Sequence, residues 1–224
     1  MIGQEPASLR LLMDSLAGAL ETTLHTGRYD GEEAAAFLHN AAGAMRACRL
    51  HPNLEAPAGT QAYPGWSALL SLAREQHEAA LIDALAAVTH DIDWIDGQHF
   101  WPGERYRYFA EKMYGALLVG DEQCSFLCDD GYILLLHTIE PHSVYPLHQH
   151  SIPEGYYVVA GNNEWSHDGE NWQCLPPGSL YYNASWQPHT IRTGDEPSLS
   201  LDIYLPPFGW DGGLCEERGI HWDV

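Results

Sequence analysis

Apolar residues in the first 90 positions recur at steps of three and four, which is the period of an amphipathic helix. The pattern predicts helices over residues 7–25, 31–49 and 66–90. Residues 51–65, between the second and third helices, are rich in Pro, Gly and Ala and are typical of a connector. The first part of the chain is therefore expected to be helical.

From about residue 114 the apolar runs become short and are separated by turn sequences, such as Asp168-Gly169 between two tryptophans. The expected strands lie at 116–120, 125–128, 133–139, 145–148, 155–160, 164–166, 171–174, 179–182, 189–192 and 198–204. Many short strands at this spacing are typical of a sandwich or barrel. Helices first and strands afterwards indicate an α+β fold.

The expected organisation is a helical segment over residues 1–104 packed on a β-barrel over residues 105–224. Residues 91–103 carry aromatic side chains among turn residues, and we expect them to cover one end of the barrel. Residues 105–112 are expected to form a short strand or a turn-rich cover.

Composition narrows the possible partners. The formal net charge of −21, without a Lys/Arg cluster, disfavours nucleic acid and anionic membranes. No secretory signal and no apolar stretch of the ~20 residues needed for a membrane span are visible, so a cytoplasmic protein is expected. Five scattered cysteines argue against a disulfide scaffold, and Cys124 and Cys128 are interpreted as buried apolar residues.

The strongest chemical pattern begins at His148 and His150, which lie two residues apart and therefore share one face of a strand. Glu154 and Tyr156 follow a short turn, and if the two strands pair as a hairpin, both residues face the imidazoles. His189, after a Pro-Pro-Gly turn, is the natural fourth ligand. Imidazole and carboxylate together predict one divalent transition metal ion, with Fe, Mn, Zn, Co and Ni all compatible.

These spacings resemble a known superfamily. His-x-His, three residues, Glu, six residues and Gly is similar to the first cupin motif, and Pro-x-Gly with a later Pro-His is similar to the second. The chain has His142 where the first motif usually opens with Gly. It has Arg192 where the second motif often has Asn shortly after its histidine. Within cupins, Tyr145-Pro-x-His-x-His, the later Glu-x-Tyr and the late His189 resemble bacterial dimethylsulfoniopropionate lyases.

The resemblance implies a double-stranded β-helix, or jelly-roll, barrel and a metal-dependent carbon–sulfur lyase that forms acrylate and dimethyl sulfide by β-elimination. A divalent ion favours the anion of a nearby phenol, so Tyr156 is the first candidate base and Tyr145 the second. Tyr181, Trp186 and Tyr204 are candidate substrate-binding residues, because a sulfonium group is attracted to aromatic faces.

Alternatives remain open at this point. The same ligands suit another small-molecule metallo-cupin, such as an Fe-dependent dioxygenase or an isomerase, or a cupin that binds a ligand without turnover. His148 is either a metal ligand or a supporting group. His137, His142 and His167 are expected to be surface or core residues, and Arg192 binds either a substrate carboxylate or a salt-bridge partner. The expected partner is a small molecule, and a homodimer is plausible.

Overall fold

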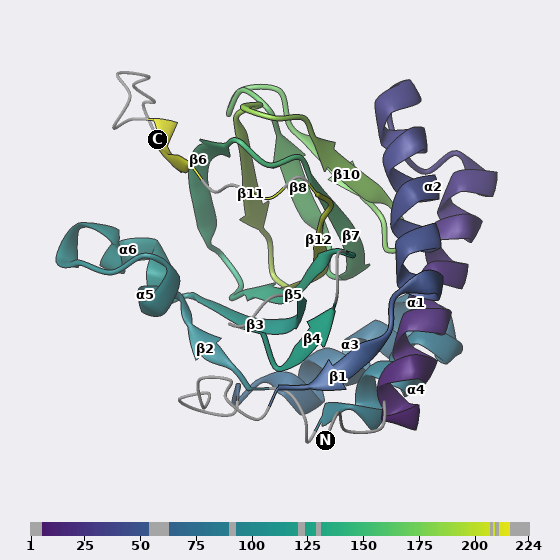
Figure 1. Ribbon diagram of the computed structural model, residues 1–224. Helices are drawn as coiled ribbons and strands as arrows, with labels where there is room; N and C mark the ends of the chain where they lie inside the picture. Colours follow the sequence, from purple (N-terminus) through teal and green to yellow (C-terminus); the bar gives the residue numbers. More distant parts are fainter. Residues whose placement is uncertain are drawn as a thin grey trace.

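The computed structural model describes residues 6–53, 63–89, 93–120, 124–128, 131–206, 208 and 211–215. The longer helices lie to the right of and below a barrel formed by two β-sheets, and short helical turns lie at its left (Figure 1). The helical elements are α1 (Ala7–Thr26), α2 (Gly31–Ala47), α3 (Trp66–Gln76), α4 (Ala79–Ala87), α5 (Gly97–Phe100), the 3-10 turn η2 (Glu104–Tyr106) and α6 (Arg107–Ala110). The arrangement confirms the expected α+β class and the two-sheet barrel that the resemblance implies.

The larger sheet has eight strands within the described residues. Its order is β1 (Leu50–Pro52), β4 (Phe126–Cys128), β3 (Met113–Gly120), β5 (Ile133–Ile139), β12 (Ser198–Tyr204), β7 (Glu154–Ala160) and β10 (Leu180–Asn183), and β2 (Ile95–Asp96) also pairs with β3. The second sheet has the order β13 (Gly212–Leu214), β6 (Val144–His150), β11 (His189–Thr193), β8 (Asn163–Ser166) and β9 (Gln173–Leu175). Because β1 and β2 precede residue 105, the first part of the chain contributes strands as well as helices; the division between residues 104 and 105 stays a prediction.

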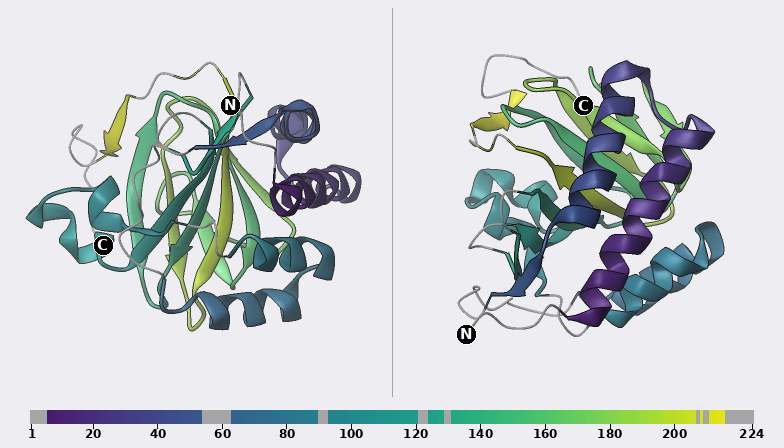
Figure 2. Two further views of the ribbon diagram at one scale, coloured as in Figure 1. Left: turned by 60° about the horizontal axis from the view of Figure 1, so that its bottom comes forward. Right: turned by 45° about the vertical axis from the view of Figure 1, so that its right-hand side comes forward.

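The larger sheet is buried on both faces. On β12, Leu199, Leu201 and Ile203 belong to the same apolar cluster as the helices α1 to α4. Asp202 and Tyr204 alternate with them and line a cavity inside the barrel. Since successive side chains on a strand point to opposite faces, one strand supplies both the packing against the helices and the lining of the cavity. Figure 2 shows the helices flanking the barrel from two further directions.

The expected helix over residues 66–90 is wrong in one respect, because it is broken into α3 and α4. His77 has an extended backbone, with φ −132° and ψ 168°, and caps the end of α3. Its Nε2 atom lies 2.8 Å from the hydroxyl of Tyr157 on β7. This tertiary contact holds His77 out of the helical conformation, which an apolar period alone does not reveal. Residue 90 lies outside the described residues.

The cover of the barrel also differs from expectation. Residues 105–112 form helical turns in η2 and α6, where a short strand or turn-rich cover was expected. The preceding segment is more regular than predicted, since β2 pairs with β3 and α5 follows it directly. Asp96 caps α5 by accepting a hydrogen bond from the backbone N–H of His99 at 3.2 Å. Residues 91 and 92, and 54–62 of the expected connector, lie outside the described residues.

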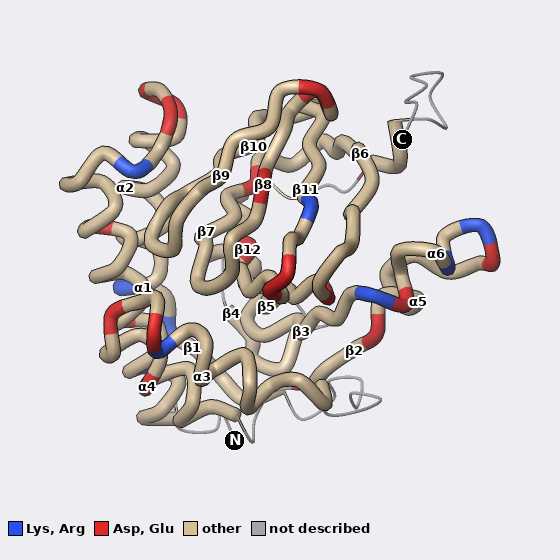
Figure 3. The backbone as a smooth tube through the Cα atoms, turned by 180° about the vertical axis from the view of Figure 1, so that it is seen from behind, with Lys and Arg blue, Asp and Glu red and all other residues tan. Residues whose placement is uncertain are grey.

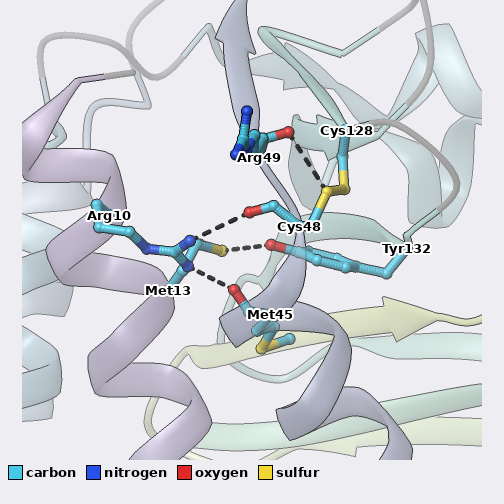
Figure 4. Close-up of a disulfide and its surroundings, with 7 residues drawn as sticks. All are labelled: Arg10, Met13, Met45, Cys48, Arg49, Cys128 and Tyr132. Carbon is cyan, nitrogen blue, oxygen red and sulfur yellow. Dashed lines mark hydrogen bonds between the residues drawn. A yellow bond between two sulfur atoms is a disulfide. The ribbon is translucent and has the colours of Figure 1, made fainter. Parts of the chain in front are cut away.

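The interpretation of Cys128 as a buried apolar residue is wrong, because Cys128 forms a disulfide with Cys48 (Figure 4). The bond joins the C-cap residue of α2 to β4. Beside it, the guanidinium of Arg10 on α1 donates hydrogen bonds to the carbonyls of Met45 and Cys48. These carbonyls at the end of α2 lack helical partners, so a cation there is favourable. Cys124 is buried, as expected.

Charged residues are dispersed over helices, loops and strands, and acidic positions exceed basic ones (Figure 3). In the part of the chain that the structure describes, none of the helices combines the length and apolar character needed to span a membrane.

We expect Cys48→Ser to lower the free energy of unfolding by about 2–4 kcal/mol, because the disulfide closes a loop between residues 80 positions apart. Denaturant unfolding without reductant measures the change. Cys174→Ser is the matched control, since Cys174 is free and exposed. Equal stability of all three proteins under these conditions would contradict a disulfide in the folded protein.

Candidate metal centre and cavity

The two strands of the expected hairpin do not pair. β6 pairs with β11 and β13 in one sheet, whereas β7 pairs with β10 and β12 in the other. The hairpin prediction is therefore wrong, but the two sheets face each other across the barrel interior. The Nε2 atom of His150 on β6 consequently lies 3.1 Å from Oε2 of Glu154 on β7. Packing of the sheets, rather than strand pairing, brings the carboxylate to the imidazoles.

A register shift in β6 decides which of its side chains share the cavity. His189 of β11 lies opposite His148, and Ile191 lies opposite Tyr145, so two steps on β11 match three on β6. An extra residue of this kind is a β-bulge, and it turns side chains three apart to the same face. The rings of Tyr145 and His148 are accordingly 4.3 Å apart. Pro146 lies within the shift, where its missing N–H is tolerated.

The structure brings together the three histidines that the sequence predicted. One ring nitrogen from each of His148, His150 and His189 lies within 4.8 Å of the others, and all three residues are buried. Their Nδ1 atoms face backbone carbonyls of Pro146, Ile152 and Gln187, at 2.9, 2.7 and 2.9 Å. A carbonyl only accepts, so each Nδ1 carries the proton and donates it. With the proton on Nδ1, a neutral ring presents its Nε2 lone pair, which is the form that binds a metal.

Glu154 completes the cluster. Its Oε2 atom lies 3.1 Å from His150 Nε2 and 3.2 Å from His189 Nε2. Asn183 donates a hydrogen bond to the same oxygen at 3.4 Å, while Oε1 is buried without a hydrogen-bond partner. Burial would raise the pKa of Glu154, but the contacts with His150 and His189 outweigh it and hold the pKa well below its usual range.

This donor set fits a divalent transition ion. Imidazole lone pairs and a carboxylate converge on one buried point, where bringing them together requires a positive charge among them. The orphaned Oε1 of Glu154 offers a further acceptor at the same place. Nitrogen and oxygen donors of this kind suit several of the transition metals. The three imidazoles could therefore hold a metal ion, with Glu154 as the fourth ligand.

A cavity of about 670 Å³ opens beside the cluster. Tyr145, Tyr156 and Tyr204 line it together with His148 and His150. A volume of this order is typical of small-molecule sites. Its remaining described lining is largely apolar or aromatic and includes Phe100, Trp101, Met113, Leu117, Ile133 and Leu135.

Two of the candidate substrate-binding residues are not among the residues that line this cavity. Tyr181 is buried between Trp165 and His167, with ring centroids 5.1 and 4.5 Å away. Trp186 is 38% exposed, and its backbone N–H donates to the carbonyl of His150 at 2.7 Å. A role for either in substrate binding stays a prediction, whereas Tyr204 is placed to contact a ligand in the cavity.

Burial raises the pKa values of the cavity phenols. For Tyr145 and Tyr156 the loss of solvent is the largest cause, and the negative charges of Glu154 and Asp202 act in the same direction. The indole N–H of Trp101 donates to the Tyr145 hydroxyl at 2.9 Å, which lowers that pKa by a smaller amount. A phenolate in this cavity therefore requires a positive charge close by.

Sequence analysis missed one pair on the cavity wall. His137 on β5 and Asp202 on β12 lie 3.3 Å apart, from Nδ1 to Oδ2, and both are buried. Ser200 donates to the other carboxylate oxygen at 2.6 Å. Burial raises the pKa of Asp202 to about 6, although His137 lowers it in part. The only sign in the sequence is that polar and apolar residues alternate along Ser198–Tyr204, and that alternation usually indicates a face in water.

The remaining sequence candidates lie away from the cluster. His142 and Asp195 form an exposed pair at 3.5 Å. Arg192 pairs with Glu164 through two hydrogen bonds of 2.7 and 3.0 Å, so the salt-bridge alternative for this arginine is confirmed. His167 approaches the cluster only indirectly, through Asn183 at 3.1 Å.

Comparison with curated proteins gives two local similarities. Over 60 residues, 27% of this chain and 30% of the relative, the chain is 37% identical to dimethylsulfoniopropionate lyase DddQ of Ruegeria pomeroyi. Over 72 residues, 30% of this chain and 38% of the relative, it is 32% identical to glucose-6-phosphate isomerase of Thermococcus onnurineus. The chain thus aligns with well under half the length of these curated relatives.

Solved structures show a wider likeness in fold. One chain from crystal structures of the DMSP lyases RdDddP and RnDddQII has a TM-score of 0.61 at 20% identity, covering 93% of this chain and 97% of that one. The crystal structure of DMSP lyase DddQ from Ruegeria pomeroyi DSS-3 has a TM-score of 0.57 at 22% identity, covering 88% and 96%. At these identities the likeness establishes the fold.

The family comparison covers most of the chain, including the metal centre. The model for dimethylsulfoniopropionate lyase matches residues 49–200. That range contains the three clustered histidines, Glu154 and both candidate tyrosine bases. The chain therefore belongs to the dimethylsulfoniopropionate lyase family.

Proposed function

We propose that this protein is a metal-dependent lyase that splits dimethylsulfoniopropionate into acrylate and dimethyl sulfide. The observation that carries the proposal is the buried cluster of His148, His150, His189 and Glu154, two of whose histidines, His148 and His150, line a cavity together with phenols. Family membership supports the same reaction. Metal binding, the base and the substrate are all parts of this proposal.

The proposed ligands are His148, His150, His189 and Glu154. A divalent ion held there supplies positive charge that stabilises the negative charge growing on a substrate carboxylate during removal of an adjacent proton. The protein's own contribution is orientation. Backbone carbonyls fix the three rings through Nδ1, and Asn183 holds Glu154 through Oε2. Such supporting contacts keep the donors in place before any ligand arrives.

Tyr156 is the proposed base. Within the described residues its hydroxyl makes no hydrogen bond, whereas the hydroxyl of Tyr145 accepts one from Trp101. The Tyr156 ring lies 5.9 Å from that of His189, and its side chain lines the cavity. A phenol beside the proposed cation loses its proton more readily, which opposes the effect of burial on its pKa.

The elimination balances without an added reactant. The Tyr156 phenolate takes the proton from the carbon next to the substrate carboxylate. The electron pair of that C–H bond forms the C=C bond of acrylate, and the C–S bond breaks with its electron pair remaining on sulfur. Dimethyl sulfide leaves as a neutral molecule, so this step needs no acid to protonate the leaving group.

The similarity to a glucose-6-phosphate isomerase supports a second candidate, a sugar isomerase using the same ligands. A phosphorylated sugar needs cationic and polar partners. In the described lining of the cavity, Arg105 is the sole Lys or Arg, and apolar and aromatic side chains dominate. This lining favours the methyl groups of a sulfonium compound over a sugar phosphate.

We expect the purified, metal-loaded protein to release dimethyl sulfide and acrylate in equal amounts from dimethylsulfoniopropionate without oxygen, because the proposed elimination needs no redox change. Gas chromatography of the headspace and liquid chromatography of acrylate measure the two products across a panel of divalent metals. Glucose 6-phosphate and fructose 6-phosphate serve as alternative substrates. Isomerisation of the sugars without any release of dimethyl sulfide would favour the second candidate.

His150→Ala and His189→Ala should each lower metal affinity by more than the ~10–100-fold typical of losing a supporting contact, because each removes a proposed ligand. Elemental analysis after dialysis measures bound metal. His39→Ala is the control, since His39 lies on the exposed face of α2. Full metal content in both variants would contradict the ligand assignment.

Tyr156→Phe should retain metal and fold but lower kcat by about 10²–10⁴-fold, the usual contribution of general-base catalysis. Tyr157→Phe is the matched control, because Tyr157 is the next residue on β7 and its hydroxyl contacts His77 on the helical side of the sheet. Tyr145→Phe tests the second candidate base in the same assay. A nearly normal rate for Tyr156→Phe would move the base assignment to Tyr145 or to water.

A further inference from the structure

Asp202 has no part in the elimination described so far, yet it holds a distinctive place in the cavity. Among the described residues that line the cavity, it is the sole carboxylate. It is 1% exposed and lies on a central strand of the larger sheet. A buried carboxylate is energetically unfavourable unless charge or hydrogen bonds compensate it, so its presence at this point calls for a partner.

His137 and Asp202 form a buried pair on the cavity wall. His137 Nδ1 faces the carboxylate at 3.3 Å and is placed to donate its proton there. The other ring nitrogen, Nε2, is buried without a hydrogen-bond partner. The pair therefore offers one carboxylate to the cavity, held in place by His137 Nδ1 and Ser200.

The position of this charge relative to the metal centre follows from strand register. Across β7 and β12, Glu154 lies opposite Tyr204, and Tyr156 lies opposite Asp202. Two residues along a strand span about 7 Å. The proposed cation therefore lies at one end of the cavity, beside Glu154. The carboxylate of Asp202 lies about two residues further along the strands, at the level of Tyr156.

Two phenol rings lie near His137, the partner of the carboxylate. The ring of His137 lies 5.5 Å from that of Tyr145 and 6.3 Å from that of Tyr156. Phenol faces attract cations whose charge is spread over methyl groups. A carboxylate with phenol rings between it and the histidine cluster favours an onium group beside it over a neutral group of the same shape.

We propose that Asp202 is the counter-charge for the cationic end of a zwitterionic substrate whose carboxylate lies at the His148, His150 and His189 cluster. The inference rests on the proposed function and names the residue that selects for its substrate class, a short carboxylic acid with an onium group on the third carbon. Asp202 also orients the substrate, because the carbon next to the substrate carboxylate then lies beside Tyr156, between the histidine cluster and Asp202.

Two unreactive ligands of nearly equal shape test the inference. 3-(Trimethylammonio)propionate carries the cation, and 4,4-dimethylpentanoate replaces its nitrogen by carbon and is neutral at that end. We expect metal-loaded wild-type protein to bind the cationic acid tighter by roughly tenfold or more, as a buried charge at this separation permits. Isothermal titration calorimetry measures both affinities and requires no turnover.

Asp202→Asn removes the charge while keeping the shape and an acceptor for Ser200. It should bring the two affinities to within about threefold of each other by weakening the cationic acid alone. Ser200→Ala is the matched control, because it removes a neighbouring hydrogen bond and leaves the carboxylate charge. Circular dichroism and metal content verify that each variant is folded and loaded.

Three results would overturn the inference: equal affinities of wild-type protein for the two acids, no measurable binding of the cationic acid, or an unchanged preference in Asp202→Asn. The first two need no variant, so they hold even if Asp202→Asn does not fold. Failure of the proposed reaction gives a different result, since the binding preference would be present while no dimethyl sulfide is released.

Discussion

The constraint on which this structure depends is that the larger sheet is buried on both faces. Helices cover its outer face through residues such as Leu201 and Ile203, and the alternate residues of the same strands line the cavity. Side chains alternate between the two faces along a strand. When one residue packs its apolar side chain against the helices, the next residue points into the barrel and can be polar. The helical layer is therefore what permits Asp202 and Tyr156 to occupy the interior, because the core that stabilises these strands lies on their other side.

Inside the barrel, burial of the polar side chains makes fixed hydrogen bonds decisive. The Nδ1 atoms of three histidines donate to backbone carbonyls, so the reactive nitrogens are aimed at one point by the main chain itself. The same low polarity raises the pKa values of Tyr145 and Tyr156 and makes an unpaired carboxylate unfavourable. The protonation of the phenols in the cavity thus depends on the position of a positive charge. The proposed base is therefore coupled to the proposed metal ligands.

The sequence predicted the positions of helices and strands better than the pairing of the strands and the tertiary contacts. Helical and two-residue periods located most helices and strands, and the spacing of His148, His150, Glu154 and His189 identified the cluster, because periodicity and ligand spacing are local properties. The pairing of β6 with β11 in place of β7, the bulge at Pro146 and the break at His77 are set by tertiary contacts that no local pattern encodes. The Cys48–Cys128 bond joins residues 80 positions apart. The burial of Asp202 inside the barrel was not predicted, because an alternating strand is usually taken to face water.

Charge conservation connects Asp202 with Tyr156. A substrate with one anionic and one cationic end adds no net charge to the cavity, so a site in which negative side chains match the proposed cation can admit it without burying excess charge. In the proposed elimination the cationic end would become neutral dimethyl sulfide, which would leave Asp202 without its proposed partner. At the same step the proposed phenolate of Tyr156 would become a neutral phenol, so one negative charge would disappear as one positive charge is lost. The total charge of the cavity is the same before and after the step. Proton transfer to a side chain in the cavity, rather than directly to solvent, is therefore the route that keeps the buried charge balanced.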